Sequence, residues 1–416
     1  MTRPELITRR DCRGCGGTSL EKIIELGPTP LANSFLTSEA EFAGERFYPL
    51  DLYFCGDCSL LQLIDVVDPE VMFRHYLYVT GTSTTIAEHN RGYARTLRDL
   101  LGLTGADLVA EVASNDGSLL RCFKDLGVRT LGIEPARNLA ASARESGIDT
   151  VNEFFSSKVG AELAAARGSA RVVIGNNVLA HVDDPADFLD GCRKLVAGDG
   201  LVTIEVPYVG ELLDRVEYDT VYHEHLSYFS VTSLLRLCER VGLRAVRIDH
   251  VPVHGGSLRL YLSKTADAHG DGPRALEAAE HQAGGAADAA RYRRFADEVR
   301  AHRDTLVHML GHLKSHGAKL AGYGAPAKGN TLLNYCRIGR DLLPFTVDKN
   351  PLKVGLYSPG MHIPVRNVEA LIEGPDAPDT VLILAWNFAE EIIGQQAAFR
   401  ARGGRFIVPI PAPRLV

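Results

Sequence analysis

Two stretches of the 416-residue chain alternate short apolar runs with helix-like segments, and this alternation constrains the fold more than any other feature. Within residues 85–265 the apolar runs read "DLVAEVAS", "TLGIEP", "RVVIGNNVLA" and "GLVTIEVPYV". Strands that alternate with helices form βαβ units, which place successive strands parallel in one sheet. The sequence therefore predicts an α/β fold built on a mostly parallel, Rossmann-like sheet.

A second, shorter alternation follows an Ala-, Glu- and Arg-rich stretch that reads as helix, interrupted near Gly284 and Gly285. Its apolar runs are "KLAGYG", "PFTVD", "TVLILAW" and "RFIVPI". The chain is also longer than the size at which a single core usually divides. We therefore expect a smaller α/β unit, attached to the first by a helical connector.

Charge and hydropathy exclude several classes of partner. The net charge of −7 leaves no basic footprint for nucleic acid. No apolar run reaches the roughly 18 residues needed to span a bilayer, and the first residues lack the apolar segment of a signal peptide. We predict a cytoplasmic protein without nucleic-acid or membrane partners, and the lack of a coiled-coil pattern favours a monomer. In a reducing compartment the eight cysteines are expected to be thiols or metal ligands.

Four of these cysteines form two C-x-x-C pairs, Cys12 with Cys15 and Cys55 with Cys58. Thiolates at this spacing bind one metal ion, and two pairs make the tetrahedral sulfur site that suits Zn²⁺. Four protein ligands leave no open coordination position, so we expect one structural zinc ion rather than a catalytic one. The alternatives are unrelated free thiols or a redox pair.

The first α/β unit carries acidic residues where its strands end. Glu111 closes one strand before the loop Asn115-Asp116-Gly117, and Glu134 closes the next. An acidic side chain at the second position accepts hydrogen bonds from ribose hydroxyls. The loop lacks G-x-G-x-x-G, which disfavours the dinucleotide of an oxidoreductase, and the pattern is that of S-adenosylmethionine methyltransferases. The candidate cofactor-binding residues are Tyr78, Glu111, Ala113, Asn115, Asp116, Gly117, Glu134, Pro135, Phe155, Asn176 and Asn177.

The second α/β unit contains the loop "AGYGAPAKGNT" between a strand and a helix. It is neither G-x-G-x-x-G nor a P-loop, but backbone N–H groups at a helix N-terminus bind phosphate oxygens, and Lys328 adds charge. The alternative is a glycine turn with solvated lysines. The candidate nucleotide-binding residues are Tyr323, Gly324, Ala325, Lys328, Asn330, Asp348, Lys349 and Lys353.

The segment "VYHEHLSYFS" concentrates titratable groups in ten residues. On a strand His223 and His225 would share a face, but a catalytic zinc site needs a third ligand, which disfavours a metal site. The remaining readings are a structural polar cluster and an acid–base centre. In the latter, His225 is the base, Glu224 orients or polarises an imidazole, and Tyr222 donates to an oxyanion.

Several motifs occur here in the order found in one family. They are the cysteine pairs, "AEVASNDGS", "NNVLAHVDDP", "YHEHLSYFS", "HGGSLR" and "GYGAPAKGNTLLNY". The chain resembles the nucleotide-sugar C-methyltransferases of antibiotic deoxysugar pathways over essentially its whole length. The resemblance implies a zinc-binding domain (1–75), a methyltransferase domain (76–265), and a helical connector with an α/β domain that holds a dTDP-sugar (266–416). It also implies that the sugar pocket is lined by Tyr76, His181, Tyr222, Glu224 and His225, with His254 of "HGGSLR" at the substrate.

Within that family the chain is most similar to tetronitrose-type 3-C-methyltransferases. The implied substrate is a dTDP-3-amino-2,3,6-trideoxy-4-keto hexose, methylated at C-3′ through an enolate. Two other functions remain open from the sequence: methylation of oxygen or nitrogen on a small molecule, and a non-catalytic protein that binds zinc and S-adenosylmethionine.

Overall fold

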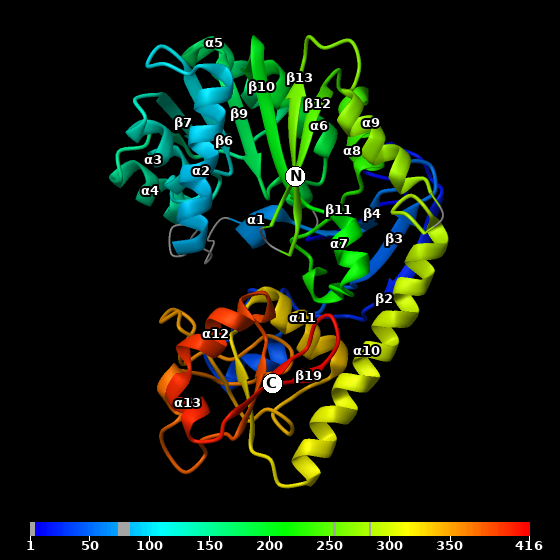
Figure 1. The fold of residues 1–416 in the computed structure, drawn as a ribbon, viewed down its shortest axis with the longest axis vertical. Helices are drawn as coiled ribbons and strands as arrows, with labels where there is room; N and C mark the ends of the chain where they lie inside the picture. The colour runs from blue at the N-terminus through cyan, green and yellow to red at the C-terminus, as the bar shows by residue number, and fades with distance from the viewer. Residues whose placement is uncertain (1–4, 74–83, 253–254, 283) are drawn as a thin grey trace.

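The computed structural model describes residues 5–73, 84–252, 255–282 and 284–416. Figure 1 shows an upper body built on a large sheet, a smaller lower body, and a long helix along one side that joins them. Three residues predicted at the site, Tyr76, Tyr78 and His254, lie outside the described residues.

The upper body contains a seven-stranded sheet in the order β12-β13-β10-β9-β6-β7-β8. All neighbours are parallel except β13, which runs antiparallel to β10 and β12. Because β6 lies between β7 and β9, the connections from it diverge and open a crevice at the carboxyl ends of these strands. The strands are β6 (Leu108–Val112), β7 (Arg129–Ile133), β8 (Thr150–Val151), β9 (Ala170–Asn176), β10 (Val196–Pro207), β12 (Arg244–Val251) and β13 (Ser257–Ser263).

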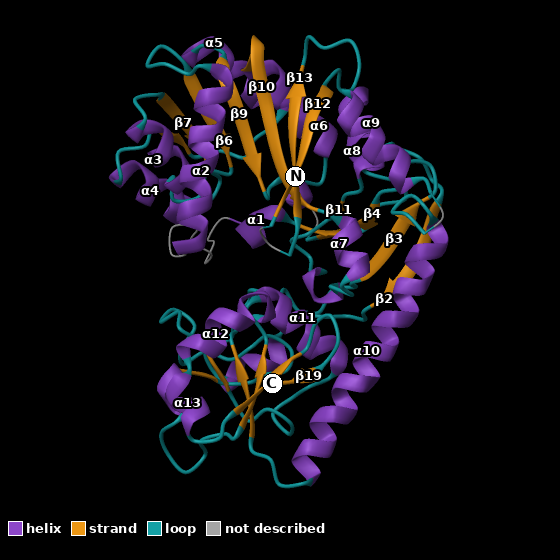
Figure 2. Ribbon diagram, in the orientation of Figure 1, coloured by secondary structure: helices purple, strands orange, loops and turns teal. Residues whose placement is uncertain are grey.

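Helices cover both faces of this sheet (Figure 2). Their starts are set locally: Asp184 caps one helix by accepting from the N–H groups of Ala186 and Asp187, and Ser230 forms a capping box with Ser233. The helices are α2 (Thr84–Leu101), α3 (Ser118–Asp125), α4 (Arg137–Glu145), α5 (Ser157–Arg167), α6 (Pro185–Leu195), α7 (Val209–Asp214) and α8 (Val231–Arg240), with the 3-10 turns η3 (Leu179–His181) and η4 (Tyr218–Thr220).

The N-terminal part forms a four-stranded antiparallel sheet, β11-β4-β3-β2, whose edge strand β11 comes from residues 227–228 of the central part. The pairing joins Ser227 to Gln62 and Tyr228 to Leu61. The elements are β1 (Leu6–Thr8), β2 (Leu20–Glu25), η1 (Glu39–Gly44), β3 (Asp51–Cys55), β4 (Leu61–Leu63), β5 (Asp65–Val67), α1 (Pro69–Phe73) and β11 (Ser227–Tyr228).

The connector consists of α9 (Asp271–Glu280) and the 27-residue α10 (Ala289–Ser315), with Gly284 and Gly285 between them. The lower body has a six-stranded sheet in the order β16-β15-β14-β17-β18-β19, parallel except for β19. Its elements are β14 (Leu320–Tyr323), α11 (Ala327–Cys336), β15 (Thr346–Val347), β16 (Val365–Arg366), η5 (Val368–Leu371), β17 (Thr380–Ile383), η6 (Trp386–Phe388), α12 (Ala389–Gln395), α13 (Ala397–Ala401), β18 (Arg405–Val408) and β19 (Arg414–Leu415).

The apolar cores cross the boundaries between these parts. One core contains Leu52 of β3, Phe295 of α10 and Leu382 of β17, and another contains Cys55 beside Val202 of β10. The predicted α/β class, with a cysteine-bearing N-terminal part and two α/β units of unequal size, is confirmed. Among the helices described, none has the length and apolarity that crossing a membrane requires.

Candidate active site

A cavity of about 1650 Å³ lies where the three parts of the chain meet. Asn33 lines it from the N-terminal part, Glu134 and His225 from the central part, and Lys328 and Lys353 from the C-terminal part. This volume exceeds that of ordinary single-ligand pockets, which reach about 1,000 Å³, so the cavity has room for two ligands side by side.

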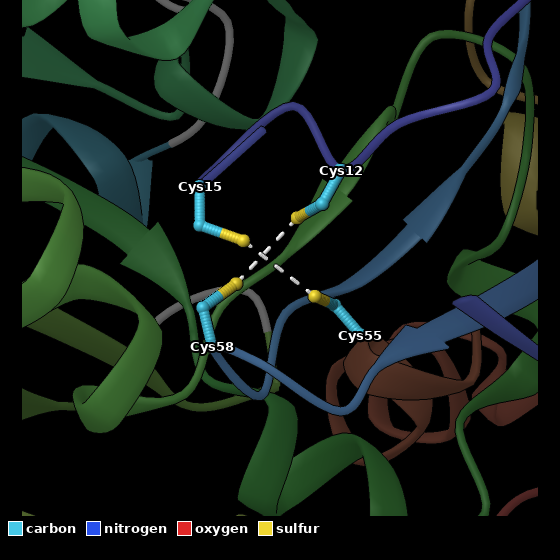
Figure 3. A group of neighbouring side chains, drawn as sticks. All are labelled: Cys12, Cys15, Cys55 and Cys58. Carbon is cyan, nitrogen blue, oxygen red and sulfur yellow. Dashed lines mark hydrogen bonds between the residues drawn. The ribbon is translucent and has the colours of Figure 1, made fainter. Parts of the chain in front are cut away.

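The four paired cysteines converge on one point (Figure 3). Their sulfur atoms all lie within 4.8 Å of one another, with Cys12 Sγ 3.5 Å from Cys58 Sγ and Cys15 Sγ 3.7 Å from Cys55 Sγ. Tetrahedral Zn–S bonds of about 2.3 Å place sulfurs roughly 3.8 Å apart, so the cluster fits a zinc ion. Three of the four side chains are buried, and the sulfurs lie within an apolar core, as a structural site requires.

One end of the cavity is formed by the strand tips of the central sheet. The carboxylate of Glu134 accepts hydrogen bonds from the N–H groups of Asn115 and Ala136, both at 2.8 Å, which fixes its orientation. Gly117 begins α3 at φ +73°, and a side chain there would press within 3.1 Å of Ile148. Glycine therefore permits the left-handed turn between the loop and α3.

Carboxyl groups gather at this end of the cavity. Glu111 is buried, and its Oε2 has no hydrogen-bond partner among the described residues. Burial, together with the nearby charges of Asp116 and Glu134, raises the pKa of Glu111 well above its usual value. The Oδ1 atoms of Asn176 and Asn177 are also buried and have no partner in the described part of the chain. Such orphaned acceptors fit a cationic ligand with several donors, which describes S-adenosylmethionine.

Most predicted cofactor residues border this end of the cavity. The lining includes Glu111, Ala113, Asn115, Glu134, Pro135, Phe155, Asn176 and Asn177. Asp116 and Gly117 lie behind the lining, where Asp116 pairs with Arg121 at 3.2 Å and supports the loop. Phe155 meets Phe188 edge-on, with ring centroids 5.5 Å apart.

The segment 221–230 contributes five residues to the cavity lining and is held by all three parts. Leu226 N–H donates to the carbonyl of Ala180, Leu63 N–H donates to the carbonyl of Leu226, and Thr331 Oγ1 of α11 donates to the carbonyl of Val221. The backbone of this segment is a turn leading into β11 rather than a continuous strand. A turn projects neighbouring side chains in different directions, which separates the two histidines.

His225 points into the cavity and contacts Tyr222. Its Nδ1 lies 2.8 Å from the carbonyl oxygen of Thr220, which only accepts, so Nδ1 carries the proton. Nε2 of the neutral ring is then the acceptor, and the hydroxyl of Tyr222 donates to it over 2.9 Å. The ring of His181 meets that of His225 edge-on at 4.8 Å. Burial lowers the pKa of His181 to about 4, so this ring is neutral at neutral pH.

His223 and Glu224 have other surroundings. The Nε2 of His223, buried at 1% exposure, donates toward the carbonyls of Tyr48 and Pro49 at 3.3 and 3.1 Å. It thus ties the turn to the N-terminal part and does not share a face with His225. Glu224 accepts from Nδ2 of Asn33 at 2.6 Å, behind the cavity wall, where Asn33 lines the cavity.

The opposite end of the cavity is formed by the C-terminal part. Lys328, Asp348, Lys349 and Lys353 line it. Lys353 Nζ donates to the carbonyl of Ala325 at 2.8 Å, and burial lowers the pKa of Lys353. Lys328 Nζ lies 4.4 Å above the ring of Trp386. This end therefore offers ammonium groups to an anionic ligand.

Four predicted nucleotide-binding residues lie outside the cavity lining. Ala325 is 1% exposed, Gly324 turns the chain after β14 at φ +90°, and Tyr323 accepts from Gln396 at 3.2 Å. Asn330 is buried and donates to the carbonyl of Ala32 at 2.7 Å, which joins α11 to the N-terminal part.

Other lining residues were not singled out from the sequence. They include Asn33, His89, Glu205 and Glu217. Glu205 forms a buried fork with Arg259 at 3.0 and 2.7 Å, and Arg259 also contacts His89 at 3.0 Å. The glutamate within the apolar run "TIEVP" could have indicated that Glu205 lies near the site. Asn33 reaches the site only through the packing of distant segments.

The divided cavity, with acidic strand tips at one end and a histidine–tyrosine pair at its centre, defines an S-adenosylmethionine-dependent methyltransferase that carries a zinc domain. Family models agree along the chain. They match a zinc binding domain at residues 12–73, a methyltransferase domain at 87–248 and a C-methyltransferase C-terminal domain at 252–411.

Curated and solved proteins extend this comparison. The chain is 40% identical to the C-methyltransferase NovU of Streptomyces niveus over 407 residues, which covers 98% of this chain and 96% of NovU. The chain belongs to this C-methyltransferase family, and both cofactors predicted from the sequence, S-adenosylmethionine and zinc, are confirmed.

Two solved methyltransferases each match less than half of the chain. The magnesium protoporphyrin IX methyltransferase of Synechocystis is 13% identical, with a TM-score of 0.34, 43% of this chain covered and 79% of that one. The CcbJ methyltransferase of Streptomyces caelestis is 14% identical, with a TM-score of 0.34, 42% of this chain covered and 90% of that one. At these TM-scores the likeness is too slight to bear on function.

Proposed function

We propose that this C-methyltransferase adds a methyl group to C-3′ of a dTDP-linked 4-keto deoxysugar, the 3-amino-2,3,6-trideoxy hexose of tetronitrose-type pathways being the implied substrate. The observation that carries the proposal is the Tyr222–His225 pair between an acidic cofactor end and a lysine-bearing end of one cavity. The protein works in this proposal as a cytoplasmic monomer, organised as domains 1–75, 76–265 and 266–416.

Carbon attacks a methyl donor only when it carries carbanion character, and a ketone makes the proton on the adjacent carbon removable. His225 is placed to act as the base because Thr220 accepts from its Nδ1, which leaves Nε2 as the acceptor of the neutral ring. As Nε2 takes the C-3′ proton, the ring becomes a cation with both nitrogens bonded. Tyr222 is the alternative base, in which case it passes its own proton to His225.

The negative charge that develops on the ketone oxygen needs a donor. Tyr222, when it is not the base, supplies a hydroxyl for this purpose by turning its proton from Nε2 of His225 to the ketone oxygen, which frees Nε2 to take the C-3′ proton. The neutral ring of His181 lies beside the pair. Glu224 positions Asn33 at the wall, and Tyr76 completes the group by resemblance. S-adenosylmethionine, when bound, supplies an electrophilic methyl group, and Glu134, Asn115, Asn176 and Asn177 are the residues that would hold it.

The C-terminal end would hold the nucleotide. Lys328, Lys349 and Lys353 provide positive charge for a diphosphate, while Asp348 accepts from Ala325 N–H at 2.6 Å and shapes the loop. Tyr323, Gly324, Ala325 and Asn330 support this loop from behind, and His254 is assigned to the substrate by resemblance.

The function is tested with a panel of dTDP-4-keto sugars and their 4-hydroxy counterparts, incubated with the zinc-loaded enzyme and methyl donor. We expect a mass gain of one methyl group only in the ketones, located at C-3′ by NMR. Without donor, the C-3′ proton should exchange with deuterium from solvent. Methylation of the 4-hydroxy sugars instead would establish an O- or N-methyltransferase.

A further inference from the structure

Of the cavity carboxyls that the chemistry above does not use, only Glu111 at the cofactor end and Glu217 have a buried oxygen without a hydrogen-bond partner among the described residues. Glu217 lies between α7 and η4, is 4% exposed and borders the same cavity as Tyr222 and His225. In the part of the chain that the structure describes, its Oε1 has no hydrogen-bond partner and no ion pair reaches the carboxyl. Because unsatisfied buried carboxyls are costly, this group points to a ligand.

Two glycines, Gly255 and Gly256, make room for the side chain of Glu217 at the cavity wall. Gly255 and Gly256 have φ of +94° and +118°, where other residues are strained. A Cβ on Gly255 would lie 2.7 Å from Oε2 of Glu217, and one on Gly256 would lie 2.7 Å from Cγ of Glu211. The glycine pair thus lets the backbone pass directly against two acidic side chains.

Two cations act on Glu217 without pairing with it in the described part of the chain. Burial raises its pKa to about 8, with Asp219 and Glu211 adding to the rise and Lys328 and Arg215 opposing it. Lys328 lies over the ring of Trp386, and Arg215 pairs with Glu211 at 3.0 Å.

Glu217 also belongs to a different end of the cavity from the acidic cofactor loop. Glu111 lies on β6 at the cofactor end, whereas Glu217 lies between α7 and η4, five residues before Tyr222. We therefore assign the group that satisfies Glu217 to the second ligand rather than to the methyl donor.

We propose that Glu217 is a subsite for a protonated amino group on the sugar and makes the enzyme prefer amino sugars over their hydroxyl counterparts. The inference rests on the proposed function, because it takes a nucleotide-linked keto sugar as the occupant. A buried carboxylate gains a charge-assisted hydrogen bond from an ammonium group, which a hydroxyl does not match.

The test compares two dTDP-4-keto sugars that differ only in an amino or a hydroxyl substituent on the ring. We expect wild-type kcat/KM to be at least tenfold higher for the amino sugar, and Glu217→Gln to lower that ratio at least tenfold. Glu211→Gln is the matched control, since it makes the same change outside the cavity lining and should keep the ratio.

Three outcomes overturn the subsite: no preference in the wild type, equal losses on both sugars in the variant, or a preference that survives Glu217→Gln. The last would mean that a protonated carboxyl donates to an oxygen, which glutamine also does. If the variant does not fold, calorimetry on wild-type enzyme with the two 4-hydroxy analogues decides, and equal affinities contradict the subsite. Failure of the wild type to methylate either ketone refutes the proposed function separately, while the calorimetry still tests Glu217.

Discussion

The phenol of Tyr222 donates a hydrogen bond of 2.9 Å to Nε2 of His225, whose other nitrogen donates to the carbonyl of Thr220. The tautomer of the imidazole is therefore fixed before any substrate arrives. A base that is already oriented lowers the activation barrier, because less orientational freedom has to be lost on the way to the transition state. This relationship makes the two residues separable by mutation.

Replacing His225 with Asn should lower kcat by about 10²–10⁴-fold, the range of general-base catalysis, because the variant loses the ring nitrogen that accepts from Tyr222 at the cavity. Affinity for S-adenosylmethionine, measured by calorimetry, should remain. Deuterium exchange at C-3′ should fall in parallel with kcat. Near wild-type turnover in this variant would mean that His225 is not the base.

Replacing Tyr222 with Phe discriminates between its two roles. As an oxyanion donor its loss should cost about 10²–10³-fold in kcat, and C-3′ exchange should slow but persist. As the base its loss should abolish exchange while His225 is intact. Tyr53→Phe, outside the cavity lining, provides the matched control.

Glu134→Gln should weaken S-adenosylmethionine binding about tenfold or more, because an amide cannot accept two ribose hydroxyls and two backbone N–H groups at once. Calorimetry of donor binding measures this directly. Glu145→Gln at the end of α4 is the control and should bind normally. Unchanged affinity in Glu134→Gln would place the ribose elsewhere.

Cys58→Ser should lower the zinc content and the midpoint of thermal unfolding, since a structural metal site is part of the folding free energy. The midpoint is followed by calorimetry and zinc by elemental analysis. Cys122→Ser changes a thiol on α3 that takes no part in the cluster and should leave both unchanged. Retention of one zinc per chain in Cys58→Ser would contradict the four-sulfur site.

The free energy of unfolding should also decrease at acidic pH, and part of this decrease should come from His223. Burial lowers its pKa to about 4, below the ordinary 6.5, so the unfolded chain binds the extra proton between these values. The contribution of this histidine is complete above pH 6.5 and is lost as the pH falls toward 4, about 2 kcal/mol by pH 5. His223→Gln, which still donates but does not titrate, should flatten the dependence of unfolding free energy on pH in this window. His316→Gln, on an exposed residue, should not.

The alternation of apolar runs was sufficient to predict the two mostly parallel sheets, because parallel strands buried on both faces leave a continuous signature such as "LVAEV". The cysteine spacing predicted the zinc site for a similar reason, since chelation depends on local geometry. Asn33 and Glu217 gave no signal, because their proximity to the cavity depends on contacts between segments far apart in sequence. The sequence also left open whether "HEH" forms a strand, because strand pairing here depends on β4 of the N-terminal part and begins at Ser227.

The pairing of Tyr228 with Leu61 has a consequence for how such enzymes diversify. The strand β4, which carries Leu61, starts three residues after Cys58. Its pairing with β11 therefore fixes the position of the reactive turn relative to the cysteine loop. Exchange of the N-terminal segment between relatives would therefore move the turn as well as the metal site. A chimaera would have to preserve the pairing of β11 with β4. In this architecture the position of the reactive turn therefore depends on a contact between two segments, so it cannot be transferred by exchanging either segment alone.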